Sequence, residues 1–200
     1  MNHRTALVLI VALFVISPVV AWLIYSGVIN VGFEATQGKN KGELVHPARP
    51  LQGFALKDAE GNQVTENDLL GLWTMVEFAA SPCVEDCMKN IYKMRQIRLA
   101  LGKDAHRAQR VVITEKPDHM AKLMADNPGT RLFLTTDSSA PLLRQFPGYS
   151  EGDISSIAER IYIVDPLGNL MMRYPPKVDA SDVLKDLRQL LKATWIRPKT

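Results

Sequence analysis

Cysteine is scarce in this chain of 200 residues, which holds only two, Cys83 and Cys87. Two cysteines form at most one disulfide, so the sequence excludes a small fold stapled by several such bonds. Blocks of like charge are also absent, because the 24 basic and 21 acidic residues are interspersed along the chain. A nucleic-acid-binding surface is therefore not indicated. The cysteine pair, four positions apart, requires a local explanation.

One stretch near the N-terminus lacks charge altogether. No charged residue occurs from Ala6 to Val31, and most of this segment is apolar. About 20 such residues span a bilayer. The small residues Val19–Ala21 resemble a signal-peptidase site, but apolar sequence continues for about ten residues beyond it, which favours an uncleaved anchor. We therefore predict a single transmembrane helix over residues 6–31.

Charge on the leader predicts the orientation of this anchor. Arg4 and the terminal amine favour a cytoplasmic N-terminus, so residues 1–5 are predicted to be a short cytoplasmic leader. The rest of the chain would then lie in the periplasm, held at the inner (cytoplasmic) membrane. Residues 32–50 are rich in Gly, Lys, Asn and Pro and predict a tether, followed by one domain over 51–200.

Short apolar runs alternate with helical patterns across the predicted domain. Alternation around Gly61 predicts a hairpin, residues 73–80 predict a buried central strand, and apolar spacing over 84–101 predicts a helix that ends at Gly102. Such an order of elements predicts an α/β fold in which helices flank a central sheet. Further predicted elements are strands at 110–114 and 131–135, a hairpin at 160–174, and helices at 118–125, 139–146 and 180–194.

The cysteine pair lies where the predicted central strand meets the next helix. Residues four apart share a helix face, so Cys83 and Cys87 could form a disulfide or hold a soft metal ion between two thiolates. A helix N-terminus stabilises the thiolate of Cys83 and favours it as the nucleophile, whereas Glu85 and Asp86 oppose this effect. Cysteines at this spacing also occur as packing residues, but an exported domain without further cysteines favours a functional pair.

Several segments match a known family. They resemble the Sco/SenC family of membrane-attached, thioredoxin-fold proteins that handle copper beside cytochrome c oxidase. This resemblance implies a thioredoxin-like fold with a central mixed β-sheet flanked by helices. It also implies that the two cysteines bind Cu(I). The matching segments are Phe54-x-Leu-x-Asp-x-x-Gly61, Leu70-Gly71-x-Trp73, Phe78-Ala-Ala-Ser-Pro-Cys83-Val-Glu-Asp-Cys87 and Ile161-Tyr-Ile-Val-Asp-Pro-x-Gly168.

Two departures from the family pattern bear on copper. Family members usually carry proline after each cysteine, whereas Val84 and Met88 stand here. The family's third copper ligand is a histidine shortly before the final hairpin, and residues 155–158 (Ser-Ser-Ile-Ala) occupy that region instead. The resemblance therefore implies an incomplete copper site. The domain's histidines, expected at its surface, are His46, His106 and His119.

Two other thioredoxin-fold classes fit less well. Peroxiredoxins and glutathione peroxidases need a hydroxyl three residues before the reactive cysteine, where this chain has Ala80. Ordinary thioredoxins place two residues between their cysteines, and this chain places three. Both classes are therefore less favoured than a divergent Sco/SenC protein.

Three functions remain open. In the first, Cys83 and Cys87 act as a thiol–disulfide oxidoreductase pair that reduces the cysteines of a copper-site partner during cytochrome c oxidase assembly. In the second, the two thiolates carry Cu(I) as a metallochaperone. In the third, the domain is a non-catalytic scaffold with a structural disulfide, bound to an oxidase subunit or another assembly factor. The absent histidine favours the first and third.

Overall fold

The structure falls into two compact units, Met1–Lys39 and Asn40–Thr200. The described residues of the first unit have helical backbone. Most of the predicted anchor over 6–31 lies outside the described residues, and within the described part no helix is both long and apolar enough to cross a bilayer. The residues that this computed structural model describes are 4–5, 12, 14–16, 18–20, 22–23, 40–117 and 120–194.

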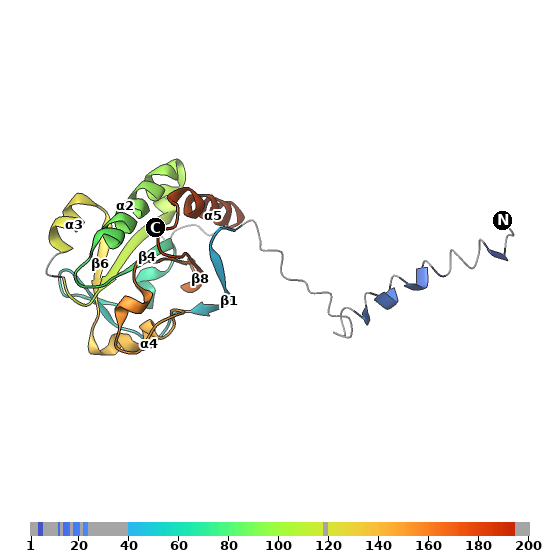
Figure 1. The fold of residues 1–200 in the computed structure, drawn as a ribbon, viewed down its shortest axis with the longest axis horizontal. Coiled ribbons are helices and arrows are strands. Elements are labelled where there is room, and N and C mark those ends of the chain that lie inside the picture. Colours follow the sequence, from blue (N-terminus) through green and yellow to red (C-terminus); the bar gives the residue numbers. More distant parts are fainter. Residues whose placement is uncertain are drawn as a thin grey trace. The chain divides into compact units, whose positions relative to one another are not determined.

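The second unit is an α/β domain in which helices cover both faces of an eight-stranded sheet (Figure 1). The α/β architecture is as the sequence predicts. The strands are β1 (Glu43–Pro50), β2 (Leu56–Asp58), β3 (Gln63–Val64), β4 (Trp73–Ala79), β5 (Ala108–Thr114), β6 (Thr130–Leu134), β7 (Ile161–Val164) and β8 (Asn169–Arg173). The helices are α2 (Glu85–Ala100), α3 (Met120–Asp126), α4 (Ala140–Leu143) and α5 (Ala180–Ala193).

The sheet is mixed, in the order β1-β8-β7-β4-β5-β6-β2-β3. The central strands β4, β5 and β6 run parallel, and the flanking pairs are antiparallel. Helices α2 and α5 pack together on one face, and α4 lies on the other (Figure 1). Parallel strands buried on both faces read as continuous apolar runs, which is why β4 was predictable from its sequence.

Strand β4 is fully buried and divides the interior into two apolar clusters. Successive side chains of a strand point to opposite faces. Trp73, Met75 and Ala79 accordingly pack under α2 and α5, whereas Val76 and Phe78 pack on the α4 side. The face under α2 therefore carries the strand positions closest to the cysteine pair.

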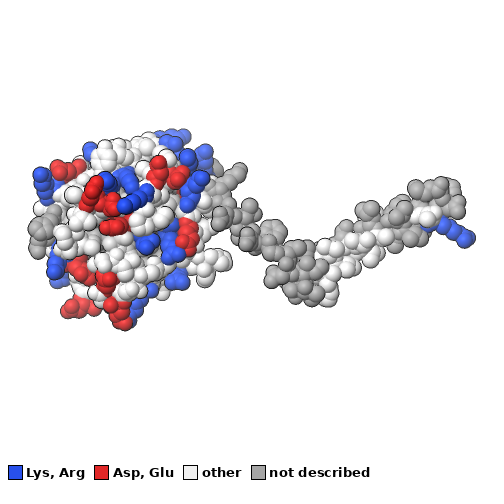
Figure 2. Space-filling model, viewed as in Figure 1, with Lys and Arg blue, Asp and Glu red and all other residues white. Residues whose placement is uncertain are grey.

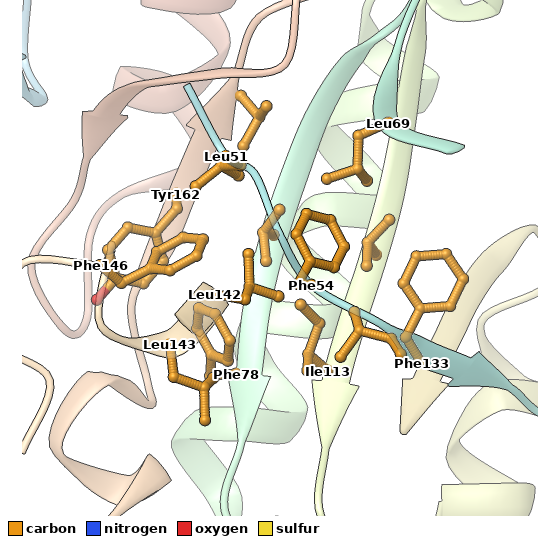
Figure 3. Packing of buried hydrophobic residues seen from close by; sticks show 14 of the residues in the cluster. Leu51, Phe54, Leu69, Phe78, Ile113, Phe133, Leu142, Leu143, Phe146 and Tyr162 are labelled. Atoms are coloured by element: carbon orange, nitrogen blue, oxygen red, sulfur yellow. The ribbon is translucent and has the colours of Figure 1, made fainter. Parts of the chain in front are cut away.

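Three aromatic rings form the centre of the cluster on the α4 side (Figure 3). The Phe78 and Phe146 ring centroids lie 4.6 Å apart, and those of Phe146 and Tyr162 lie 5.0 Å apart, both edge to face. This geometry suits the charge distribution of aromatic rings. The three rings join β4, β7 and the segment after α4 into one core.

The predicted tether over 32–50 is wrong for its second half, because residues 43–50 form β1 at the edge of the sheet and pair with β8. An edge strand has one free side, and almost all of β1 is exposed. Its sequence therefore lacks the apolar alternation that reveals a half-buried strand. The domain begins at Asn40 rather than at residue 51.

A buried carboxylate fixes the start of β1 to the domain. Asp186 of α5 accepts hydrogen bonds from the backbone N–H groups of Lys41 (2.8 Å) and Gly42 (2.9 Å) and from the Tyr174 hydroxyl (3.0 Å). A Cβ on Gly42 would lie 2.6 Å from the Tyr174 ring, so only glycine fits there. These contacts explain why the polar segment before β1 is ordered.

Smaller differences affect other predicted elements. The helix predicted over 139–146 is shorter, because Ser139 belongs to a preceding 3-10 turn and α4 ends at Leu143, ahead of Pro147 and Gly148.

The face of the domain drawn in Figure 2 carries the interspersed positive and negative charge expected from the sequence.

Candidate functional site

The structure joins Cys83 and Cys87 in a disulfide, with their Cα atoms 5.4 Å apart. The two sulfurs differ in exposure. Cys87 is 2% exposed and lies among the apolar side chains under α2, whereas Cys83 is only partly buried. An incoming thiolate can therefore reach the Cys83 sulfur more readily than the Cys87 sulfur.

The strand-to-helix junction positions Cys83. Strand β4 ends at Ala79, and α2 begins after its N-cap residue, Val84, whose side chain makes no capping hydrogen bond. The first N–H groups of a helix lack partners within the helix, and they favour a negative charge placed beside them. Reduction would therefore leave Cys83 next to a feature that stabilises its thiolate.

Two carboxylates in the first turn of α2 disfavour a thiolate at Cys83, but each has a basic partner. Glu85 pairs with Lys89, and Asp86 lies 3.6 Å from the Lys177 ammonium. These partners offset part of the negative charge near Cys83. Glu85 and Asp86 therefore destabilise the Cys83 thiolate less than their charges alone suggest.

A buried carboxyl group lies beneath α2. Glu77 projects from β4 on the face of Met75 and Ala79, is fully buried, and accepts a hydrogen bond from the Asn90 side-chain amide at 3.3 Å. Asn90 follows Cys87 by three positions, which places the two on neighbouring points of the buried helix face. Through Asn90, Glu77 is therefore linked to the buried helix face that carries Cys87.

Burial raises the pKa of Glu77 well above its ordinary value. The Asn90 hydrogen bond acts in the opposite direction, the negative charge of Glu159 adds to the increase, and Lys93 reduces it. Glu77 was not among the site residues predicted from the sequence. Its only signal there was a lone carboxylate inside a mostly apolar strand, which does not by itself indicate a site.

The described residues offer two sulfur ligands for a soft metal ion and little else. No group of three or more histidine, cysteine or acidic side chains that could hold a metal occurs in the described part of the chain. The segment expected to lack the copper-ligand histidine forms a turn whose apolar members, Ile154 and Ile157, are buried in the core. His46 and His106 are exposed, and His119 lies outside the described residues. Two thiolates fit Cu(I), which accepts soft ligands in low coordination.

Comparison with protein families identifies the domain. A family model described as "Transmembrane-like, thioredoxin-like, C-terminal domain" matches residues 73–194, from the start of β4 to the end of α5. The chain belongs to this family. The thioredoxin-like fold predicted for the domain is therefore confirmed. A sequence comparison with curated proteins finds no match.

Solved structures with the same fold include Sco proteins. Copper-bound yeast Sco1 has a TM-score of 0.60 at 21% identity, over 73% of this chain and 96% of that one. BsSco, a member of the Sco family of cytochrome c oxidase assembly proteins in which a disulfide switch was identified, has a TM-score of 0.54 at 15% identity, over 74% and 96%. A thiol:disulfide interchange protein from Bacteroides sp. has a TM-score of 0.52 at 16% identity, over 72% and 90%.

These similarities confirm the predicted resemblance to Sco/SenC proteins at the level of the fold. At such identities the chemistry must be derived from the residues themselves. The residues that the sequence singled out, Cys83 and Cys87, are brought together, and the hydrogen-bonded pair of Asn90 and Glu77 lies under the same helix.

Proposed function

We propose that this thioredoxin-like protein is a membrane-anchored thiol–disulfide reductant that acts on the cysteines of a copper-site partner during cytochrome c oxidase assembly. The observation that carries the proposal is the asymmetric pair, with an accessible Cys83 bonded to a buried Cys87 at the N-terminus of α2. The oxidase partner rests on the similarity to Sco proteins. The structure would represent the oxidised state of the cycle.

The reaction uses both sulfurs in turn. In the reduced protein, the Cys83 thiolate attacks one sulfur of the partner's disulfide, forms a mixed disulfide, and releases the partner's other sulfur as a thiolate. The Cys87 thiolate then attacks the Cys83 sulfur, which closes the Cys83–Cys87 bond and releases the second partner thiolate. The protein is thereby oxidised by two electrons and the partner is reduced by two. An external dithiol must reduce the pair before the next cycle.

Glu77 is suited to assist the second step. Cys87 is buried, so water does not readily reach its thiol. The proton that this thiol must lose therefore has to pass to a nearby protein group. The Glu77 carboxyl, whose pKa is raised by burial, is held by Asn90 one turn of α2 beyond Cys87 and is the buried group proposed to exchange a proton with that thiol. Asn90 holds the Glu77 carboxyl in place as a positioning residue.

The test is the reduction potential of the pair, measured on the full chain in glutathione buffers of graded composition. A potential above about −300 mV, in the range of known oxidoreductases, supports thiol exchange. A potential below about −300 mV is typical of structural disulfides, and would replace the proposal with the scaffold function.

A second candidate is transfer of Cu(I), with copper as cargo. It is favoured by the two adjacent sulfurs, which the reduced pair would present to one ion, and by the similarity to copper-bound Sco1. A titration of the reduced chain against a moderate Cu(I) chelator tests it. Retention of one equivalent of copper, lost in a Cys87→Ser variant, supports the role. Complete loss of copper to the chelator excludes it.

Anchoring belongs to the same proposal. The uncharged segment over 6–31 would hold the protein in the inner membrane with the thioredoxin-like domain in the periplasm. Protease added to spheroplasts should degrade the domain while a cytoplasmic control protein survives. If the protease degrades the domain only after the cells are lysed, the domain lies in the cytoplasm.

A further inference from the structure

The large exposed apolar side chains of the domain are concentrated on α2. Among described residues from Asn40 onward, six large hydrophobic side chains are exposed, and four of them lie on α2 or at its N-cap. The other two, Leu44 and Leu167, lie on β1 and in the β7–β8 turn. The four are Val84 (52% exposed), Met88 (45%), Tyr92 (53%) and Leu99 (59%).

These side chains form one stripe that starts beside the disulfide. Val84, Met88 and Tyr92 follow one another at intervals of four residues, and Leu99 comes seven later, so all lie on one helix face. Val84 directly follows Cys83. We call Val84, Met88, Tyr92 and Leu99 the α2 stripe. Clustered exposed apolar side chains of this kind mark interaction sites on soluble domains.

One positive charge lies within the α2 stripe. Arg95 follows Tyr92 by three positions and precedes Leu99 by four, so it shares their face. It has no acidic partner among the described residues, whereas Glu85 and Asp86 are both paired. The buried Arg110 and the half-buried Arg98 lie close enough to add to the positive charge there. A ligand that covers the α2 stripe should bring a carboxylate to Arg95.

We propose that the α2 stripe is the docking surface for a cysteine-bearing protein segment that is apolar around its cysteine and carries an acidic residue. This inference rests on the proposed thiol-exchange function and specifies its partner. A segment whose sulfur reaches Cys83 comes close to the start of α2, where Val84 and Met88 are exposed. Helical rise places Arg95 roughly 17 Å beyond Cys83, which an extended segment covers in about five residues.

The probes are two disulfide-linked peptide homodimers. Both carry one central cysteine and a glutamate about five residues away on each side, in keeping with that span. One has leucines and the other has serines between these positions. The full-length chain, reconstituted in lipid nanodiscs to avoid detergent on the apolar surface, is reduced and then mixed with each peptide. The measured quantity is the ratio of the two reduction rates.

The wild-type chain should reduce the leucine peptide about tenfold faster, the effect of burying roughly 60 Å² of apolar area in the encounter. A chain with Met88→Gln and Tyr92→Gln, both exposed helix positions, should lower the ratio to about one. Arg95→Gln should weaken the dependence of the leucine-peptide rate on salt. Leu167→Gln, an even more exposed apolar position in the β7–β8 turn, which lies at the start of β4 while Cys83 follows its end, should keep the wild-type ratio.

Each other outcome has a defined meaning. A wild-type ratio near one, or a ratio that survives the double substitution, overturns the docking surface. If the chain forms a concentration-dependent dimer that the double substitution abolishes, the α2 stripe serves self-association. That result also overturns the docking surface. Oxidised glutathione, too small to cover the stripe, tests the proposed function separately. If the chain exchanges with glutathione but shows no peptide preference, only the docking surface fails, and if it exchanges with neither, the thiol function fails.

Discussion

The side-chain amide of Asn90 donates a hydrogen bond to the buried Glu77 carboxyl, at 3.3 Å, one turn of α2 beyond Cys87. This contact connects the central strand β4 to the helix that carries the disulfide. It also fixes a titratable group where the sheet and helix exclude water. The stability of the domain and the chemistry of its cysteines should both depend on the protonation of Glu77.

Glu77→Gln should make the domain less sensitive to alkaline pH. Because the folded-state pKa of Glu77 lies above its ordinary value of 4.5, the protonated group favours the folded state at low pH. That stability is lost as pH rises from about 4.5 through the raised pKa, by up to about 1.4 kcal/mol per pH unit. Urea unfolding at pH 5 and pH 8 should therefore show the variant gaining stability over wild type at the higher pH.

The matched control for this experiment is Glu60→Gln, which removes an exposed carboxylate from the β2–β3 turn. Its difference from wild type should be nearly the same at both pH values. An equal difference for Glu77→Gln would mean that Glu77 is ionised in the fold, against the direction of its pKa shift.

The two cysteines should react at different rates once reduced. In Cys87→Ser, the remaining Cys83 is partly exposed, so iodoacetamide should modify it readily at pH 7.5. In Cys83→Ser, the remaining Cys87 is 2% exposed and should react at least about tenfold more slowly. Mass spectrometry of the modified chains gives both rates. A faster Cys87 would reverse the assignment of nucleophile and resolving cysteine.

The cysteine pair and its setting were predictable from the sequence because each part has a local signal. An apolar run, a Ser-Pro break and a helical period place Cys83 between strand and helix, and the structure has them there. Glu77 was not predictable as a site residue, because its importance comes from Asn90 and from burial on both sides of the sheet. Such contacts depend on packing between elements, which sequence spacing does not report.

The start of the domain was predicted at the wrong place for a related reason. Residues 43–50 have no apolar alternation, and their strand exists because β8 offers its edge and Asp186 holds the preceding turn. The partners of that turn lie more than 140 residues away in the chain. A composition rich in lysine, glycine and proline therefore indicated a tether although the fold uses it as an edge strand.

Asp186→Ala should destabilise the domain by about 3 kcal/mol. The substitution leaves the Lys41 and Gly42 N–H groups and the Tyr174 hydroxyl without their shared acceptor, and buried groups without partners are costly. Chemical denaturation measures the loss, and hydrogen exchange should show β1 opening first. Asp182→Ala, on the same helix, removes a first-turn carboxylate and its pairing with Lys185, and should cost less than about 1 kcal/mol. Equal costs for the two variants would mean that Asp186 does not hold β1.

Reduction of the disulfide should leave the domain folded. The bond closes a loop of only a few residues, since its cysteines are four apart, so the entropy it removes from the unfolded chain amounts to about 2 kcal/mol. Cys87 is the one bonded cysteine within the two clusters of buried side chains, so we expect the packing of the other members to survive when the bond opens.

Urea unfolding with and without a phosphine reductant should therefore shift the midpoint without abolishing the cooperative transition. A Cys83→Ser, Cys87→Ser double variant should match the reduced protein and show no response to the reductant. A reductant that unfolds the wild-type chain outright would show that the bond holds the fold together, and a pair that must open in every cycle could not have that role.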